Sequence, residues 1–253
     1  MIFGVLTLEE RDGNMNVDKK TVKTAGILYL IIVIGSILGG VLSEMYIQSH
    51  LAGSVAGDFM NMPDWVYRVG FSIYLLVYLS DMATALVLYI LLKPVNKGLA
   101  LLAAFFRFAE AVILGINMLN HYAVFLILSG TVSLAVFNPM QLNGAAQILL
   151  DAHRSGYLIG QVFFGVHCFF LGNLLFKSGY FPNVLGVFLI AASFGYLIES
   201  FVYFLLPNHE TVEAVATWIV ALPAFLAELS LTYWLLFKNS DVEMRYNQIS
   251  VPA

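Results

Sequence analysis

Charged side chains are scarce in this sequence: Asp, Glu, Lys and Arg make up 11% of its 253 residues, whereas 60% are hydrophobic. Soluble globular domains carry charge on about a quarter of their residues, so this composition excludes an ordinary soluble protein. The formal net charge of −4 provides no basic surface for nucleic acid. We therefore expect the chain to lie in a lipid bilayer.

Cysteine occurs once, as Cys168, which excludes an intramolecular disulfide and a redox pair. The chain also lacks the Gly-x-Ser-x-Gly elbow of many hydrolases, the His-Glu-x-x-His zinc pair and a phosphate-binding glycine loop. The internal repeat found in many secondary transporters is not visible either. The sequence therefore contains no familiar enzyme motif and leaves the cofactor unknown.

Long apolar runs recur along the chain, each long enough to cross a bilayer as a helix of about 20 residues. They cover residues 24–47, 66–92, 99–128, 157–176, 184–206 and 215–237. The sequence therefore predicts an all-α, polytopic membrane protein that forms a bundle of about six transmembrane helices.

Basic residues are distributed unevenly between the segments that connect these runs. Alternation of the segments puts most lysines on one side and only Arg68 and Arg154 on the other, so the positive-inside rule predicts that both termini are cytoplasmic. We expect a disordered N-terminal extension over 1–20, a six-helix transmembrane domain over 21–238 and a cytoplasmic C-terminal tail over 239–253. Met15 would begin the chain as naturally as Met1 does.

One outward segment contains a helix start signal. Asn138 is a good N-cap residue, and Pro139 fits the first helical position because its missing N–H would have no partner there. The pattern predicts a short helix through about Ala152, separate from the following span. Such a helix would lie on the lipid surface or cover the bundle as a lid.

Ionisable side chains inside the apolar runs are the feature that most needs an explanation. A charge near the bilayer centre costs at least roughly 2.5–3.5 kcal/mol, so such groups usually face a protein interior, pair with one another and mark a site. The residues concerned are Asp81, Arg107, Glu110, His167 and Glu228, with Glu199 nearby. Counting about 1.5 Å per helical residue from the nearest cytoplasmic lysine predicts that four helices bring these groups into one layer near the middle of the membrane.

Four polar residues also recur along the third span at helical spacing. Arg107, Glu110, Asn117 and His121 fall within roughly 80° of arc on one helix. This stripe would run from the middle of the membrane to its outer surface. It would then line a water-filled vestibule.

The charges of these groups do not balance. Four carboxylates against Arg107 leave a net charge of −3 if all are ionised and His167 is neutral, which is not tenable in hydrocarbon. Some carboxyl groups then hold protons at neutral pH, or His167 is charged, or a cation or cationic substrate occupies the centre. Each of these alternatives predicts a functional site.

A purely structural explanation exists for some of the same residues. Arg107 and Glu110 are spaced to form an ion pair within one helix, which would allow both to be buried. Asp81 could be neutral and hydrogen-bonded, because Ser80 and Thr84 supply hydroxyl groups nearby.

Several segments of the chain carry a resemblance to a known family. They are GILYL at 26–30, YILLKPVNK at 89–97, FRFAEA at 106–111, FFGVH at 163–167 and FKSGYFP at 176–182 with LG at 185–186. From about Thr24 to Tyr203 the chain resembles the bacterial membrane family called domain of unknown function 4386. The resemblance implies a multi-pass protein of a prokaryotic cytoplasmic membrane, with Arg107, Glu110 and His167 at positions of the family pattern. It implies no activity.

Three functional classes are compatible with the sequence. The first, which we favour, is a membrane protein that binds or carries a small molecule, a proton or a cation, with Asp81, Glu110 and Glu228 exchanging protons. The second is an intramembrane metal-dependent hydrolase of lipids, in which His167 and carboxylates would be ligands. The third is a structural or sensory partner protein whose polar layer fixes helix register. The expected partners are the lipid bilayer and a small-molecule or ion ligand.

Overall fold

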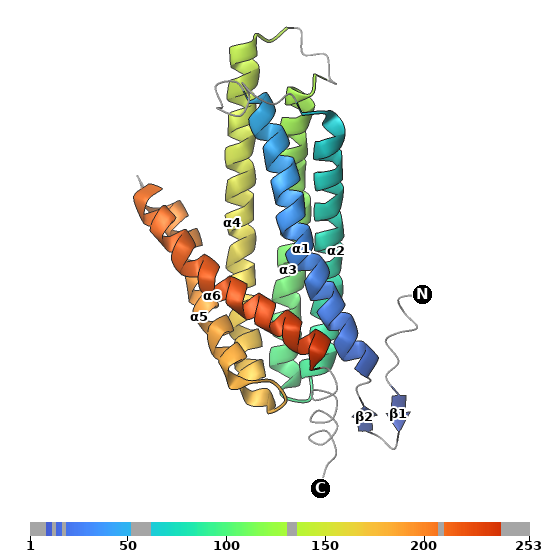
Figure 1. Cartoon of the computed structure of the whole chain (residues 1–253). Coiled ribbons are helices and arrows are strands. Elements are labelled where there is room, and N and C mark those ends of the chain that lie inside the picture. The colour runs from blue at the N-terminus through green and yellow to red at the C-terminus, as the bar shows by residue number, and fades with distance from the viewer. Residues whose placement is uncertain are drawn as a thin grey trace. The chain divides into compact units, whose positions relative to one another are not determined.

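The computed structural model describes residues 9–11, 14–16, 19–51, 62–130, 136–206 and 210–238, without the side chains of its strands or of 210–223. Within these ranges the chain forms two short strands and six helices (Figure 1). The elements are β1 (Glu9–Arg11), β2 (Asn14–Asn16), α1 (Lys19–His50), α2 (Asp64–Leu92), α3 (Lys97–Leu128), α4 (Pro139–Ser178), α5 (Asn183–Leu205) and α6 (Glu210–Phe237). The C-terminal tail predicted over 239–253 lies outside the described residues.

The two strands are antiparallel, with Glu9 opposite Asn16 and Arg11 opposite Asn14. They lie within residues 1–20, for which the sequence predicts a disordered extension, and α1 begins at Lys19. Most of that range lies outside the described residues. The domain boundaries drawn from the sequence stay predictions.

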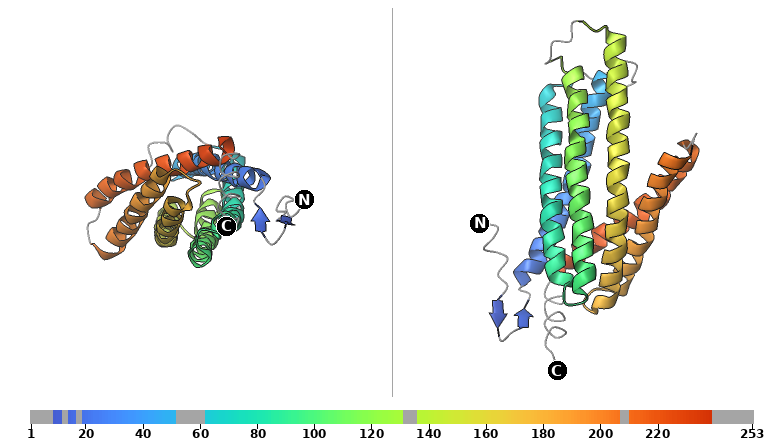
Figure 2. Two further views of the ribbon diagram at one scale, coloured as in Figure 1. Left: turned by 90° about the horizontal axis from the view of Figure 1, so that it is seen from below. Right: turned by 180° about the vertical axis from the view of Figure 1, so that it is seen from behind.

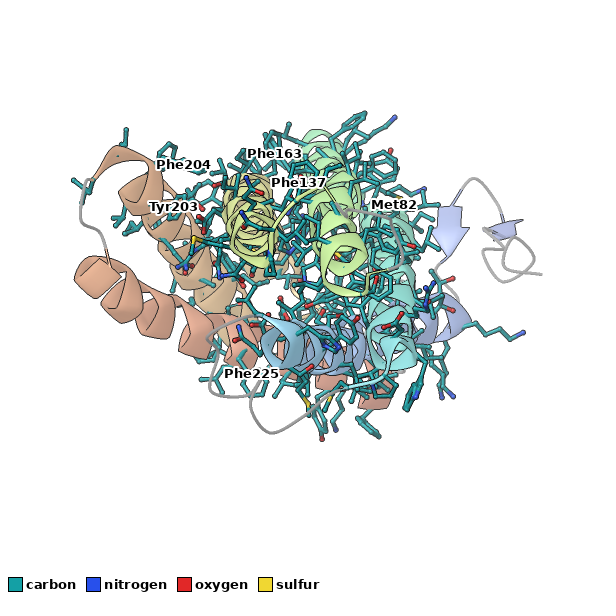
Figure 3. The ribbon with its side chains drawn as sticks, turned by 90° about the horizontal axis from the view of Figure 1, so that it is seen from above. Met82, Phe137, Phe163, Tyr203, Phe204 and Phe225 are labelled. Atoms are coloured by element: carbon teal, nitrogen blue, oxygen red, sulfur yellow. The ribbon has the colours of Figure 1, made fainter. Side chains whose placement is uncertain are left out.

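The helices have the length and apolar character of membrane spans. α1 to α5 are each long and apolar enough to cross a bilayer, and α6 contains the shorter apolar segment Ala224–Phe237 among its described side chains. Large apolar side chains are exposed along them, and Phe204 of α5 and Phe225 of α6 project outward (Figure 3). Such a surface is stable in lipid and unfavourable in water. The predicted all-α polytopic bundle is confirmed.

The separate short helix predicted after Asn138 is wrong, because α4 runs without a break from Pro139 to Ser178. Its predicted start is confirmed: the Asn138 side chain accepts a hydrogen bond from the Gln141 N–H at 2.9 Å, and the Gln141 side chain accepts one from the Asn138 N–H at 2.9 Å. This reciprocal pair is a capping box. Nothing breaks the helix after Ala152, because the polar residues that follow include no proline and a single glycine, Gly156, is tolerated in a helix.

The chain forms two compact units. Unit 1 comprises Met1–Leu30, Ser80–Glu110 and Gln161–Ala253, and unit 2 comprises Ile31–Leu79 and Ala111–Gly160. Helices α1 to α4 each contribute one segment to both units, whereas α5 and α6 belong to unit 1 alone. Within unit 1, α5 and α6 pack side by side (Figure 2).

The core of unit 1 draws side chains from all six helices, among them Tyr29, Leu91, Leu171 and Leu231. The turn between α4 and α5 is tied to this core by Tyr180, which is buried and donates a hydrogen bond to the Leu91 carbonyl at 2.5 Å. That carbonyl is one of the last four of α2, which have no partner within the helix. The hydrogen bond therefore fixes the end of α2, the helix that carries Asp81.

Unit 2 has an aromatic core. The rings of Tyr67 and Phe125 stack with their centroids 4.4 Å apart, and Tyr46 lies at 5.5 Å from each of them. The Tyr46 hydroxyl donates a hydrogen bond to Asp64 Oδ1 at 2.9 Å. Offset and tilted ring pairs of this kind hold helices together beyond the contribution of buried area alone.

In unit 1, α4 and α5 approach each other closely at two glycines. A Cβ atom added at Gly172 would lie 2.7 Å from the Gly186 carbonyl oxygen, and one added at Gly186 would lie 2.6 Å from the Gly172 carbonyl oxygen. Because both obstacles are backbone atoms, neither moves without shifting a helix. Small residues that allow this approach are typical of contacts between membrane helices.

We expect Gly172→Ala to lower the free energy of unfolding by about 1–3 kcal/mol through this overlap. Gly144→Ala is the matched control on α4, because a Cβ there meets no atom of the described residues within 4 Å. It should leave stability unchanged or raise it by about 0.5–1 kcal/mol. Thermal unfolding in detergent measures both, and equal behaviour of the two variants would contradict the contact.

Candidate functional site

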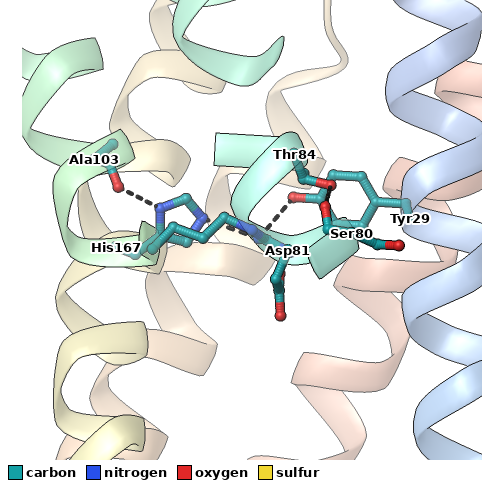
Figure 4. A network of polar contacts seen from close by, with 7 residues as sticks. Tyr29, Ser80, Asp81, Thr84, Ala103 and His167 are labelled. Carbon is teal, nitrogen blue, oxygen red and sulfur yellow. Dashed lines mark hydrogen bonds and ion pairs between the residues drawn. The ribbon is translucent and has the colours of Figure 1, made fainter. Parts of the chain in front are cut away.

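Polar residues of several helices gather in unit 1, among them Tyr29, Asp81 and His167 (Figure 4). Arg107 of α3 is 2% exposed and forms an ion pair with Asp81 of α2 through Nη2 and Oδ1. Its Nη1 donates hydrogen bonds to the Tyr29 hydroxyl of α1 at 3.1 Å and to His167 Nε2 of α4 at 3.2 Å. Four helices therefore meet on one guanidinium group.

Two aromatic rings complete the surroundings of this guanidinium. Arg107 Cζ lies 4.9 Å from the centroid of the Tyr29 ring and 5.6 Å from that of Phe164. Arginine is more weakly hydrated than lysine and stacks on aromatic faces, so these rings offset part of the free energy of its burial. Neither aromatic residue was among the predicted site residues. Both residues lie in sequence segments that resemble the family, and this was the one feature of the sequence that could have pointed to them.

The hydrogen bonds of His167 determine its tautomer. Nδ1 lies 2.8 Å from the Ala103 carbonyl oxygen, which only accepts, so Nδ1 carries the proton. Nε2 is then the acceptor for Arg107. A second proton on Nε2 would point at the guanidinium, so this arrangement requires a neutral imidazole. Both ring nitrogens are engaged.

Of the two hydroxyl groups near Asp81, that of Thr84 is committed to another acceptor. Thr84 donates its hydroxyl hydrogen to the Ser80 carbonyl at 2.7 Å, and Asp81 pairs with Arg107 (Figure 4). The ion pair within α3 is also absent among the described residues, because the partner of Arg107 is Asp81 on α2 rather than Glu110. The charged state of Asp81 is therefore stabilised by a neighbouring helix.

Two carboxyl groups remain beside this pair without a cation of their own. Glu110 of α3 is 4% exposed, and its Oε2 accepts no hydrogen bond from the described residues. Glu228 of α6 is partly buried. The charges of Arg107, Asp81 and Glu228 act on Glu110, and those of Arg107 and Asp81 act on Glu228. All five ionisable groups predicted for the middle layer thus belong to one electrostatic cluster, although their role in binding stays a prediction.

The other predicted site residues lie elsewhere. Glu199 of α5 is partly buried, and its charge is not among those that act on Arg107, Asp81 or Glu110. Asn117 and His121 are buried in unit 2. There the Asn117 side chain donates a hydrogen bond to the His153 carbonyl oxygen. The His121 ring is hydrogen-bonded to the Tyr67 hydroxyl and packs against the His153 ring.

The described side chains of the arginine cluster do not form a metal site. Among them, no group of three or more His, Cys, Asp or Glu residues surrounds one point. His167 is committed through both nitrogens. Cys168 is buried beside it as a free thiol. The described side chains of this cluster that remain without an ion-pair partner are the carboxyl groups of Glu110 and Glu228.

We expect Asp81→Asn and Arg107→Gln each to destabilise the protein by about 3–5 kcal/mol, because each leaves one buried charge without its partner. The double variant should be more stable than the sum of the two effects predicts, by at least about 1 kcal/mol. Unfolding in mixed detergent micelles measures all three, with the exposed Asp151→Asn as the control that changes little. Additive effects would show that the pair is energetically unimportant.

Comparisons with known proteins agree with the resemblance seen in the sequence. The family model described as Domain of unknown function (DUF4386) matches residues 24–239, a range that includes α6 and Glu228. The chain is also similar to a protein of Archaeoglobus fulgidus named "Uncharacterized protein", with 30% identity over 180 residues, or 71% of this chain and 88% of that protein. No solved structure matches the chain. The chain therefore belongs to the family defined by domain of unknown function 4386.

Proposed function

We propose that the protein is a membrane carrier or binding protein in which Glu110 and Glu228 take up and release protons. The observation that supports this function is the charge balance of the buried cluster. Arg107 and Asp81 neutralise each other, and His167 is neutral by its hydrogen bonds. Two carboxyl groups are left over. A buried carboxylate without a partner costs several kcal/mol, so each holds a proton or a bound cation.

The fixed parts of the cluster and its exchangeable parts are different residues. Arg107 is held by an ion pair, two hydrogen bonds and two rings, so it acts as a scaffold. Glu110 Oε2 has no hydrogen-bond partner among the described residues, and neither has Arg107 Nε. An orphan acceptor and an orphan donor in the same cluster favour the entry of a proton or a water molecule.

A proton accounts for these observations better than a metal cation. Alkali and alkaline-earth ions need about six oxygen ligands, more than two carboxyl groups supply. A proton needs one oxygen atom. Glu228 is partly buried, whereas Glu110 is 4% exposed.

The two other classes receive less support. In a lipid hydrolase dependent on a metal, His167 would have to give up a hydrogen bond before it could become a ligand. A layer that only fixes helix register would satisfy all of its polar atoms, since unsatisfied ones are costly to bury. The unsatisfied atoms of Glu110 and Arg107 favour a working site.

We also place the protein in the cytoplasmic membrane of a prokaryote with both termini in the cytoplasm. The distribution of lysine and arginine between the connecting segments supports the orientation. The similarity to a protein of an archaeon supports the kind of organism. Modification of cysteines introduced into the two terminal segments, in intact cells, tests the orientation.

Proton release on chemical unfolding tests the proposed function. In water a glutamate is ionised at neutral pH, so protons held by the folded cluster are released when the chain unfolds at constant pH. Because buried neutral histidines take up some protons on unfolding in every variant, the difference is decisive: we expect Glu110→Gln and Glu228→Gln each to release about one proton per chain fewer than the wild type. Glu44→Gln, which removes an exposed carboxyl group of unit 2, should match the wild type.

Two results would overturn this function. Release of sodium or potassium in place of protons would identify the cluster as a cation site. Release of neither would show that the carboxyl groups are ionised and compensated within the protein.

A further inference from the structure

A second polar cluster lies in unit 2, outside the arginine cluster and its proposed role. The imidazole rings of His121 on α3 and His153 on α4 have their centroids 4.7 Å apart, with an angle of 58° between the ring planes. His121 is buried. His153 precedes the apolar run of the fourth span, so sequence reasoning missed it, and the continuous α4 brings it to His121.

Both imidazoles are anchored through Nδ1. His121 Nδ1 lies 2.9 Å from the hydroxyl oxygen of the buried Tyr67. His153 Nδ1 donates to the Asn117 carbonyl oxygen at 3.3 Å, and Asn117 Nδ2 donates in return to the His153 carbonyl oxygen at 2.7 Å. Histidines that bind metals almost always have their second ring nitrogen held in this way.

The hydrogen bond of His153 leaves its other ring nitrogen available, and the same holds for His121 when its Nδ1 donates to the Tyr67 hydroxyl oxygen. Because His153 Nδ1 carries its proton, its Nε2 presents a lone pair. Nε2 of neither His121 nor His153 makes a hydrogen bond to any residue of the described ranges. A lone pair on such a nitrogen can accept a proton, a hydrogen bond from water or a metal ion.

The spacing of the rings fits ligation of one ion. With metal–nitrogen bonds of about 2.1 Å, two imidazoles bound through nitrogen to one ion at an angle of about 90–110° have ring centroids roughly 4.6–5.3 Å apart. The observed 4.7 Å lies within this range. Two axial ligands on opposite sides of a haem would be farther apart, so the spacing excludes that group.

The position of His153 is fixed by close packing as well as by hydrogen bonds. A Cβ atom added at Gly156, one turn further along α4, would lie 2.1 Å from Asn117 Oδ1. Asn117 thus fits against the backbone of α4 and holds the carbonyl of His153. The negative charge of Glu44 also acts on His153, which favours a bound cation.

We propose that His121 and His153 form a binding site for a divalent first-row transition-metal ion such as Zn²⁺ or Co²⁺. Imidazole nitrogen is a preferred ligand of these ions. The described side chains supply two ligands, since no group of three or more His, Cys, Asp or Glu surrounds one point. Water fills the remaining positions, which leaves the ion open to an exchangeable ligand.

Titration of the untagged, full-length protein in detergent with Co²⁺ tests the proposal, because the visible absorption of Co²⁺ reports nitrogen ligation. We expect saturable binding of about one ion per chain that Zn²⁺ displaces. His121→Gln and His153→Gln should each raise the dissociation constant by at least about tenfold, and Tyr67→Phe, which frees His121 Nδ1, by about tenfold. His50→Gln is the matched control in unit 2, since the His50 ring stacks on Tyr46 and its Nδ1 is engaged by Ser49 and the Tyr46 carbonyl oxygen, and it should bind like the wild type.

Histidine nitrogen resonances of the wild type keep the proposal testable if a variant fails to fold. In protein labelled with ¹⁵N at histidine, Zn²⁺ should shift the Nε2 resonances of two of the five histidines. Absence of saturable Co²⁺ binding would overturn the proposal. So would equal loss of binding in His50→Gln, or Zn²⁺ shifts confined to histidines other than His121 and His153.

Discussion

The buried ion pair of Arg107 and Asp81 is the interaction on which the rest of unit 1 depends. A guanidinium inside a membrane protein is stable only where a carboxylate, acceptors and aromatic faces surround it, and these come from four helices here. Removal of one of these helices would leave a buried charge exposed to hydrocarbon. The ion pair therefore specifies which helices meet and in which register, a role that apolar side chains fill poorly in lipid.

The same ion pair explains why the remaining carboxyl groups matter. Once Asp81 is committed to Arg107, Glu110 and Glu228 lie in the same electrostatic cluster, and Arg107 is the one cation among the described residues whose charge is seen to act on them. The buried polar cluster of unit 2 is built from groups that can all be neutral. They are a tyrosine hydroxyl, an amide and two imidazoles. Among the described residues, the fully buried Asp, Glu and Arg side chains thus all belong to unit 1, which is why we assign proton exchange there and metal binding to the imidazoles of unit 2.

Much of this arrangement follows from the sequence. The apolar runs predict the helices because length and hydropathy are sufficient for spans, and counting residues from the cytoplasmic lysines predicts that Asp81, Arg107 and His167 meet. The sequence does not show which of these groups pair with one another. The spacing along α3 predicts Glu110 as the partner of Arg107, whereas packing of the helices makes Asp81 the partner. The length of α4 was mispredicted because polar residues after Ala152 resemble a loop until a neighbouring helix supplies hydrogen bonds for them. Tyr29 and Phe164 were missed because an aromatic residue in a span carries no charge to mark it.

Infrared difference spectroscopy of the purified, metal-free protein near neutral pH tests the central claim most directly, because it detects the carbonyl stretch of a protonated carboxyl group inside the protein. The charge balance around Arg107 predicts such a band in the wild type, with one component lost in Glu110→Gln and another in Glu228→Gln. A wild-type spectrum without any protonated carboxyl band would contradict the assignment of these two residues as proton carriers.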